Sequence, residues 1–140
     1  MNMSEDKDLP DEKSEFFGII DRPAPYDVWY SDGRRRIRGY SVKVLDMRHY
    51  QDKEWESTVH GFETVEAATE YASRRMRASV EKARGDCTDA EAIRRHWFAW
   101  GEDCLVIFAY KGSEDLDFFL ANPGSPEECD YRSIEPRISS

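Results

Sequence analysis

The segment from Asp46 to Glu56, DMRHYQDKEWE, holds the side chains best suited to chemistry in this 140-residue chain. His49 and Asp52 are three positions apart, and a carboxylate that fixes the tautomer of an imidazole turns it into a general acid or base. Tyr50 lies between them and is the third candidate. The same composition is also typical of a polar loop between two strands, so both interpretations stay open.

A second candidate is the acidic pair Glu102-Asp103, which follows a predicted helix directly. Acidic side chains are unfavourable at a helix C-terminus, and a local conflict of this kind is typical of functional sites as well as of solvated turns. If the protein is an enzyme or a ligand binder, we predict its site between the His49–Asp52 loop and the Glu102–Asp103 turn.

No common nucleotide-binding, zinc-protease or serine-hydrolase motif occurs in the sequence. The three histidines, His49, His60 and His96, do not pair at helical spacing, and a partial site of His49 with Asp52 or His60 is the weaker alternative to ordinary loop histidines. Cys104 has no basic neighbour in the sequence and is expected to be a buried small apolar residue. We therefore predict no metal and no cofactor.

The net charge of −9 is concentrated at the ends of the chain, with −5 in residues 1–21 and −6 in residues 101–140. Affinity for nucleic acid depends on Lys and Arg that neutralise phosphates, so acidic ends argue against it. The basic run Arg34-Arg35-Arg36 lies among aromatic residues and is the exception, since such a pattern can stack single-stranded bases. A charged hairpin edge that discourages edge-to-edge pairing is the preferred interpretation.

A non-enzymatic domain that acts through a protein partner is the leading functional prediction. Interfaces favour tryptophan, tyrosine and arginine as anchors, and the first predicted hairpins hold Trp29, Tyr30, Arg34 and Trp55. An acidic mimic or inhibitor that occupies a basic surface is a weaker alternative. The oligomeric state is left open.

The chain is predicted to be cytoplasmic and not to enter a membrane. Three cysteines, an odd number without a C-x-x-C pair, suit reduced thiols. The N-terminal segment is acidic and lacks an apolar region, so we expect no signal peptide. No apolar run approaches the roughly 18–20 residues that a membrane span requires.

The elements that position these residues follow from periodicity. We predict a disordered acidic tail over residues 1–15, a single domain over 16–121 and an irregular C-terminal tail over 122–140. Alternating apolar residues predict strands over Tyr26–Tyr30, Arg36–Leu45 and Trp55–Phe62, the first two joined at Asp32-Gly33.

Apolar spacing of three and four residues predicts a long helix over Thr64–Arg84 with Thr64 as its N-cap. Thr88 to Glu91 matches a capping box, so a second helix starts there and ends at Gly101.

Leu105–Tyr110 is the most continuously apolar run and is predicted as a central strand buried on both faces, with Leu116–Ala121 as its hairpin partner. Strands and helices are grouped rather than alternating. This order predicts an α+β fold, an antiparallel sheet of four to five strands packed against one long and one short helix.

Four short motifs resemble a group of small bacterial proteins to which no activity is assigned. In chain order they are a strand that ends in Asp46, the His49-Tyr50-Gln51-Asp52 loop, the helix entry at residues 61–67 (GFETVEA) and Gly101-Glu102-Asp103. The resemblance covers residues 40–107, about half of the chain. It implies no catalytic residue, and the chain departs from the group's pattern at Cys104-Leu105, where a proline and an aromatic residue are expected.

Overall fold

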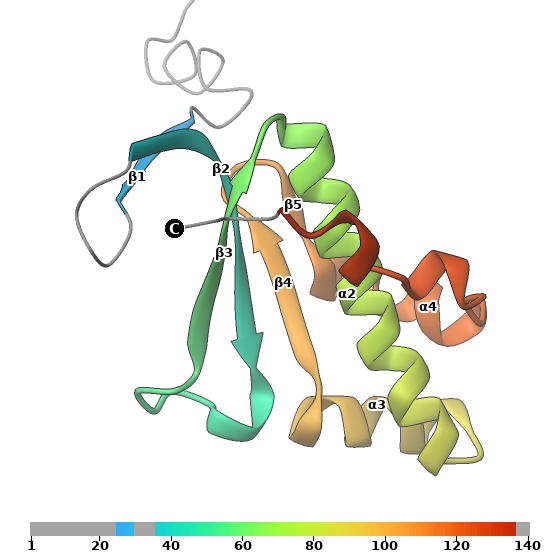
Figure 1. Ribbon diagram of the computed structural model, residues 1–140. Helices are drawn as coiled ribbons and strands as arrows, with labels where there is room; N and C mark the ends of the chain where they lie inside the picture. The colour runs from blue at the N-terminus through green and yellow to red at the C-terminus, as the bar shows by residue number, and fades with distance from the viewer. Residues whose placement is uncertain (1–24, 30–35, 137–140) are drawn as a thin grey trace, which may run out of the picture.

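The computed structural model describes residues 25–29 and 36–136, and its strands and helices form two layers, a sheet and a layer of helices beside it (Figure 1). In chain order the elements are β1 (Tyr26–Trp29), β2 (Arg36–Asp46), η2 (Met47–His49), β3 (Glu56–Phe62), α2 (Val65–Asp86), α3 (Ala90–Trp100), β4 (Glu102–Val106), β5 (Tyr110–Lys111), η3 (Gly112–Asp115), α4 (Leu116–Ala121), η4 (Glu127–Cys129) and η5 (Arg132–Ile134), where η denotes a short 3₁₀ helix. The predicted α+β class and antiparallel sheet are confirmed.

The sheet is organised around β2, which pairs antiparallel with β1, β3 and β4, while β5 extends it beyond β4. Val42 and Val44 alternate along β2 and are buried against the helices. The β2–β3 register shifts between Tyr40 and Val42, and Gly61 lies opposite this irregularity with φ of 98°. Glycine adopts this left-handed backbone without the steric cost that other residues meet.

The long helix α2 covers the inner face of the sheet (Figure 1). The N-cap of α2 is Thr64, as predicted, and its Oγ1 accepts a hydrogen bond from the Ala67 N–H at 3.0 Å. For α3 the capping residue is Asp89 rather than Thr88, because the Asp89 carboxylate accepts from the Ala92 N–H at 2.8 Å. The buried stripe of α2 has the helical spacing read from the sequence and consists of Val65, Ala68, Tyr71, Ala72, Met76, Val80 and Ala83.

The core has two parts that meet along α2. One part joins the first half of the helix to the sheet, and the other joins its second half to α3 and α4 around the fully buried Trp97. Each large buried side chain, such as Trp97, contributes a few kcal/mol to folding. Because both parts of the core contain residues of α2, this helix is the element on which the sheet and the other helices pack.

The prediction for Leu105–Tyr110 was wrong in its bounds. The strand β4 starts three residues earlier, at Glu102, and ends at Val106. The chain then turns at Phe108, which has φ of 67° and is 65% exposed. The Ala109 N–H donates to the Val106 carbonyl across this turn at 2.9 Å. A continuous apolar run therefore contains both a buried strand and an exposed turn.

The prediction of a strand over Leu116–Ala121 was also wrong, because these residues form α4. Leu116, Phe119 and Leu120 are buried and Phe118 is exposed, which is the helical spacing of three and four residues. Six residues that are nearly all apolar carry no usable period, so the sequence could not distinguish the two structures.

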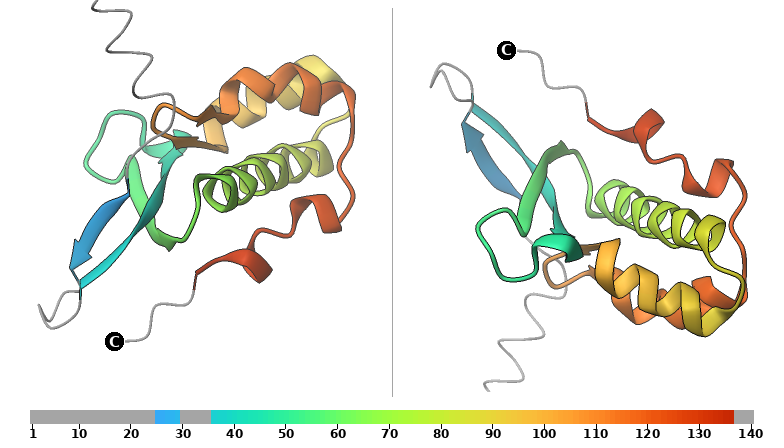
Figure 2. Two further views of the ribbon diagram at one scale, coloured as in Figure 1. Left: turned by 90° about the horizontal axis from the view of Figure 1, so that it is seen from above. Right: turned by 90° about the horizontal axis from the view of Figure 1, so that it is seen from below.

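Residues 122–136, here called the C-terminal strap, pack along α2 on the side opposite to α3 and α4 (Figure 2). Arginine side chains of α2 hold it by its main-chain carbonyls, with Arg74 donating to Asp130 at 3.0 Å and Arg77 to Asn122 at 2.6 Å. The Glu81 carboxylate accepts from the Gly124 N–H at 3.0 Å. The strap thus lacks strands and long helices but has a defined position.

The predicted acidic tail over residues 1–15 lies outside the described residues, as do Tyr30 and Arg34, and Trp29 lies in β1. Within the described part of the chain, no helix combines the length and the apolar character needed to cross a bilayer.

The helical assignment of α4 makes two neighbouring phenylalanines unequal. Phe119 is 3% exposed and Phe118 is 58% exposed, so Phe119→Ala is expected to lower the free energy of unfolding by about 3–4 kcal/mol. Phe118→Ala should lower it by less than about 1 kcal/mol. Urea denaturation of both variants tests this, and the reverse ranking would indicate a strand with Leu116, Phe118 and Leu120 on its inner face.

Candidate functional site

The predicted His49–Asp52 pair exists in the loop between β2 and β3. His49 Nδ1 lies 3.1 Å from an Asp52 carboxylate oxygen, and Nε2 lies 3.4 Å from Glu54. Both ring nitrogens therefore face carboxylates of the same exposed loop. Asp52 also accepts from the Glu54 N–H at 2.7 Å, so the carboxylate organises the turn of the loop as well as the imidazole.

The aromatic residues of this loop pack on each other. The Tyr50 and Trp55 rings lie edge to face with centroids 5.1 Å apart, and Tyr50 is largely exposed. The Trp55 carbonyl accepts from the Asp46 N–H at 2.7 Å, which closes the loop at its base. Of the four partner-binding residues predicted from the sequence, Trp55 is the one whose side chain is described, and it lies at an intermediate level of exposure.

Each residue of the Gly101-Glu102-Asp103 turn has a different neighbour. A Cβ on Gly101 would lie 2.3 Å from the buried Trp97 ring, so only glycine lets the chain pass from α3 into β4 at this point. Glu102 receives two hydrogen bonds from the Arg75 guanidinium, at 2.9 and 3.2 Å. Asp103 is 6% exposed, and its Oδ1 has no hydrogen-bond partner among the described residues.

Burial raises the pKa of the Asp103 carboxyl above its ordinary value, although hydrogen bonds from Ser113 oppose the shift. Asp46, at the end of β2, behaves in the opposite way. Hydrogen bonds from Arg48 hold the pKa of Asp46 below its ordinary value, and burial only partly offsets them.

The loop and the turn meet through the main chain, because the Met47 N–H donates to the Gly101 carbonyl at 2.9 Å. Their candidate side chains do not share a cleft. His49 and Asp52 face each other within the loop, Glu102 faces Arg75, and Asp103 lies against η3. The structure therefore brings the two segments together without assembling one reacting centre from them.

A groove that the sequence did not indicate lies beside this junction. It is a half-open hollow of about 590 Å³. Its wall combines the end of β2 with η2, one stripe of α2, the end of α3, the start of β4 and the strap. Its lining residues are Asp46, Arg48, Arg75, Ala78, Ser79, Lys82, Ala83, His96, Trp100, Gly101, Glu102, Tyr131 and Arg132.

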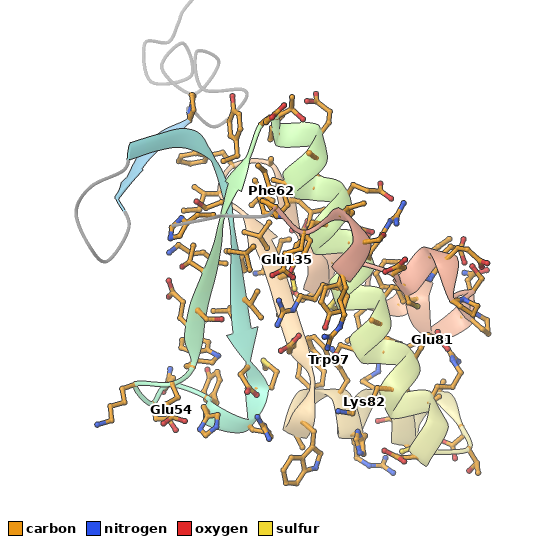
Figure 3. The ribbon with its side chains drawn as sticks, viewed as in Figure 1. Glu54, Phe62, Glu81, Lys82, Trp97 and Glu135 are labelled. Atoms are coloured by element: carbon orange, nitrogen blue, oxygen red, sulfur yellow. The ribbon has the colours of Figure 1, made fainter. Side chains whose placement is uncertain are left out.

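The groove is positively charged within a protein of net charge −9. Four arginine or lysine side chains line it, against two carboxylates. Asp46 and Glu102 are each paired with an arginine. Lys82 has no hydrogen bond or ion pair within the described part of the chain, and it lies on the half of α2 beside α3 (Figure 3). Lys82 is thus a cation available to a ligand.

Arg75 connects the groove to the core and to the strap. Besides its bonds to Glu102, it donates to the Tyr71 hydroxyl at 2.8 Å, and that hydroxyl donates to Glu135 at 3.0 Å. Burial raises the pKa of Tyr71, so the phenol stays protonated and keeps this donor role. The Tyr131 ring of the strap lies 5.0 Å from the Arg75 guanidinium, within the range of a cation–π contact.

The exposed aromatic of the groove is Trp100, the last residue of α3, which is 61% exposed. On the strap, the Arg132 guanidinium lies 5.5 Å from the Tyr131 ring. Together these side chains give the groove an aromatic rim and cations on separate walls. Such an arrangement has the charge to attract anions and offers aromatic surface for packing.

No metal centre is evident in the described part of the chain, where no three histidine, cysteine or carboxylate side chains are grouped as ligands. Cys87, Cys104 and Cys129 are free thiols. A comparison of the chain with protein-family models, with curated proteins and with solved structures finds no match. The resemblance of residues 40–107 to a group of bacterial proteins therefore stays a prediction.

Removal of the Arg75 side chain tests its connecting role. Arg75→Ala leaves Glu102 and Tyr71 without their shared partner, and we expect the free energy of unfolding to fall by about 2–4 kcal/mol. Arg95→Ala is the matched control because its ion pair with Glu91 is fully on the surface of α3, and it should cost less than about 0.5 kcal/mol. Equal losses in urea denaturation would show that Arg75 has no special role.

The two aspartates predict opposite pH dependences. The raised pKa of Asp103 means that its contribution to stability is present below the ordinary value of 3.8 and is lost as the pH rises. The lowered pKa of Asp46 means that its contribution is present above 3.8 and is lost as the pH falls.

The free energy of unfolding of each Asp→Asn variant, measured from pH 3 to 7, checks both signs. Relative to the wild type, the Asp103→Asn variant should gain stability as the pH rises, and the Asp46→Asn variant should lose stability. Parallel curves for the two variants would contradict the assigned environments.

Proposed function

We propose that the protein is a non-catalytic binding domain that takes hold of a protein partner through the positively charged groove. The observation that carries this proposal is the presence of Lys82, a cation without a partner among the described residues, in a hollow that Arg48 and Arg132 approach from separate elements. Charge complementarity of this kind gives an interface its specificity and its orientation.

The geometry favours binding over acid–base chemistry. A general acid or base must reach the reacting proton on a substrate, yet both carboxylates of the groove, Asp46 and Glu102, are held by arginines. His49 is held between Asp52 and Glu54 in the neighbouring loop and does not line the groove. A small enzyme with its site at this junction remains the alternative proposal, supported by the Met47–Gly101 hydrogen bond that joins the two segments.

We also propose a cytoplasmic location. The three free thiols support it, because a reducing compartment keeps cysteines unpaired. The acidic mimic stays the weaker proposal. The described acids of the strap support it less, since Glu135 bonds to Tyr71 and Glu128 to the Ser125 N–H rather than forming one acidic face.

Charge reversal at Lys82 tests the groove. We expect the wild type to bind a polyanionic probe at low salt, either a glutamate-rich peptide or inorganic triphosphate, in isothermal titration calorimetry. Lys82→Glu replaces an attraction with a repulsion, so the affinity should fall at least about tenfold, equivalent to about 1.4 kcal/mol.

The matched control is Lys53→Glu, which makes the same charge change on an exposed lysine outside the groove. Its affinity should stay within about twofold of the wild type because it does not meet the ligand. Equal losses in the two variants, or no binding of either probe by the wild type, would refute the proposed function.

A further inference from the structure

The main-chain donors where η2 meets the start of β4 are already used. The Gly101 N–H donates to the Trp97 carbonyl at 2.7 Å, and the Glu102 N–H donates to the Ser79 hydroxyl at 2.8 Å. The Arg48 N–H donates to the Asp46 carboxylate at 3.0 Å. Phosphate sites are typically built from free N–H groups in a loop or at a helix N-terminus. At this junction an anion can therefore be bound by side chains of the groove rather than by main-chain N–H groups.

The end of α3 that lines the groove is the one that is unfavourable for binding an anion. Trp100 is the last residue of α3, so the groove meets the C-terminal end of that helix. This end carries partial negative charge and weakens the binding of a concentrated double charge such as phosphate. Single carboxylates placed away from it, near the cations, avoid this cost.

The cations of the groove lie on separate elements rather than at one point. Arg48 is on η2 and is already paired with Asp46, while Lys82 on α2 and Arg132 on η5 have no carboxylate partner among the described residues. On α2, the small residues Ala78 and Ser79 line the groove beside Lys82. An extended peptide places successive side chains of one face about 7 Å apart, so its carboxylates can reach cations on separate elements.

The charge of the whole protein restricts the length of the ligand. Outside the groove the chain carries an excess of acids that brings the total to −9. A long polyanion such as nucleic acid would meet repulsion there. A short acidic segment contacts the groove alone, and an apolar residue within it can pack on the exposed Trp100 ring.

From these contacts we infer that the ligand of the groove is a short, extended, acidic segment of a protein, with carboxylates for Lys82 and Arg132 and an apolar residue for Trp100. The inference rests on the proposed function and names the class of ligand that the same groove takes.

Two probes of similar charge separate a carboxylate peptide from a phosphate ligand. One is a blocked decapeptide with four glutamates spaced by serine and one central leucine, and the other is inorganic triphosphate. Both are titrated into the full chain at the same ionic strength. We expect the peptide to bind at least about tenfold more tightly, because its carboxylates reach separate cations and its leucine reaches Trp100.

Trp100→Ala should lower the affinity for the peptide about fivefold. Phe98→Ala is the matched control, since Phe98 is another exposed aromatic of α3 (51%, against 61% for Trp100) and does not line the groove. Its affinity should equal that of the wild type, and unchanged circular dichroism of both variants verifies folding. A Trp100→Ala variant that binds like Phe98→Ala would contradict the aromatic contact and overturn the inference.

The remaining outcomes separate the two proposals. If triphosphate binds as tightly as the peptide or more tightly, and Lys82→Glu abolishes this binding, the ligand class inferred here is wrong while the groove remains a binding site. If neither probe binds the wild type, the proposed function fails and the inference fails with it.

Discussion

The Arg75 guanidinium is the contact on which the arrangement of the other parts depends. It joins Glu102 at the start of β4 to the Tyr71 hydroxyl on α2, and through that hydroxyl to Glu135 of the strap. Tyr131 packs against it from the same strap. An arginine can serve three partners at once because its planar fork presents five donors in fixed directions. The sheet, the long helix and the strap are thereby held in one mutual position.

That position creates the groove. Because Arg75 satisfies Glu102, the acidic turn after α3 does not place a free negative charge beside Lys82. Because the strap is held against α2, Arg132 lines the same hollow as Arg48 although 84 residues separate them in the sequence. A structural ion pair thus leaves Lys82 and Arg132 free to meet a ligand.

Much of the fold could be predicted from the sequence where one periodicity extends over many residues. The helix α2 was predicted with its N-cap and to within two residues of its end, because 22 residues give the helical period several repeats. Leu116–Ala121 could not be predicted because a run of six mainly apolar residues fits a strand and a helix equally well, and packing of Phe119 beside α2 decides between them. The turn at Phe108 could not be predicted for a similar reason, since a phenylalanine gives no turn signal even when it is exposed.

The candidate site was predictable in part. The segments around His49 and Glu102 were selected from their composition, and their main chains do meet. The groove was not predictable, because its cations are single residues on separate elements and no spacing relates them. That Lys82 has no ion-pair partner among the described residues can be seen only when the partners of the other charged residues are known.

A nuclear magnetic resonance titration of the ¹⁵N-labelled full chain with the glutamate-rich decapeptide tests the central claim most directly. We expect the shifted amide signals to belong to four segments far apart in the sequence, namely η2, residues 79–83 of α2, the end of α3 and residues 131–132. All four should shift together with one dissociation constant. Shifts confined to one segment, or centred on the His49–Asp52 loop without α2 and the strap, would contradict it.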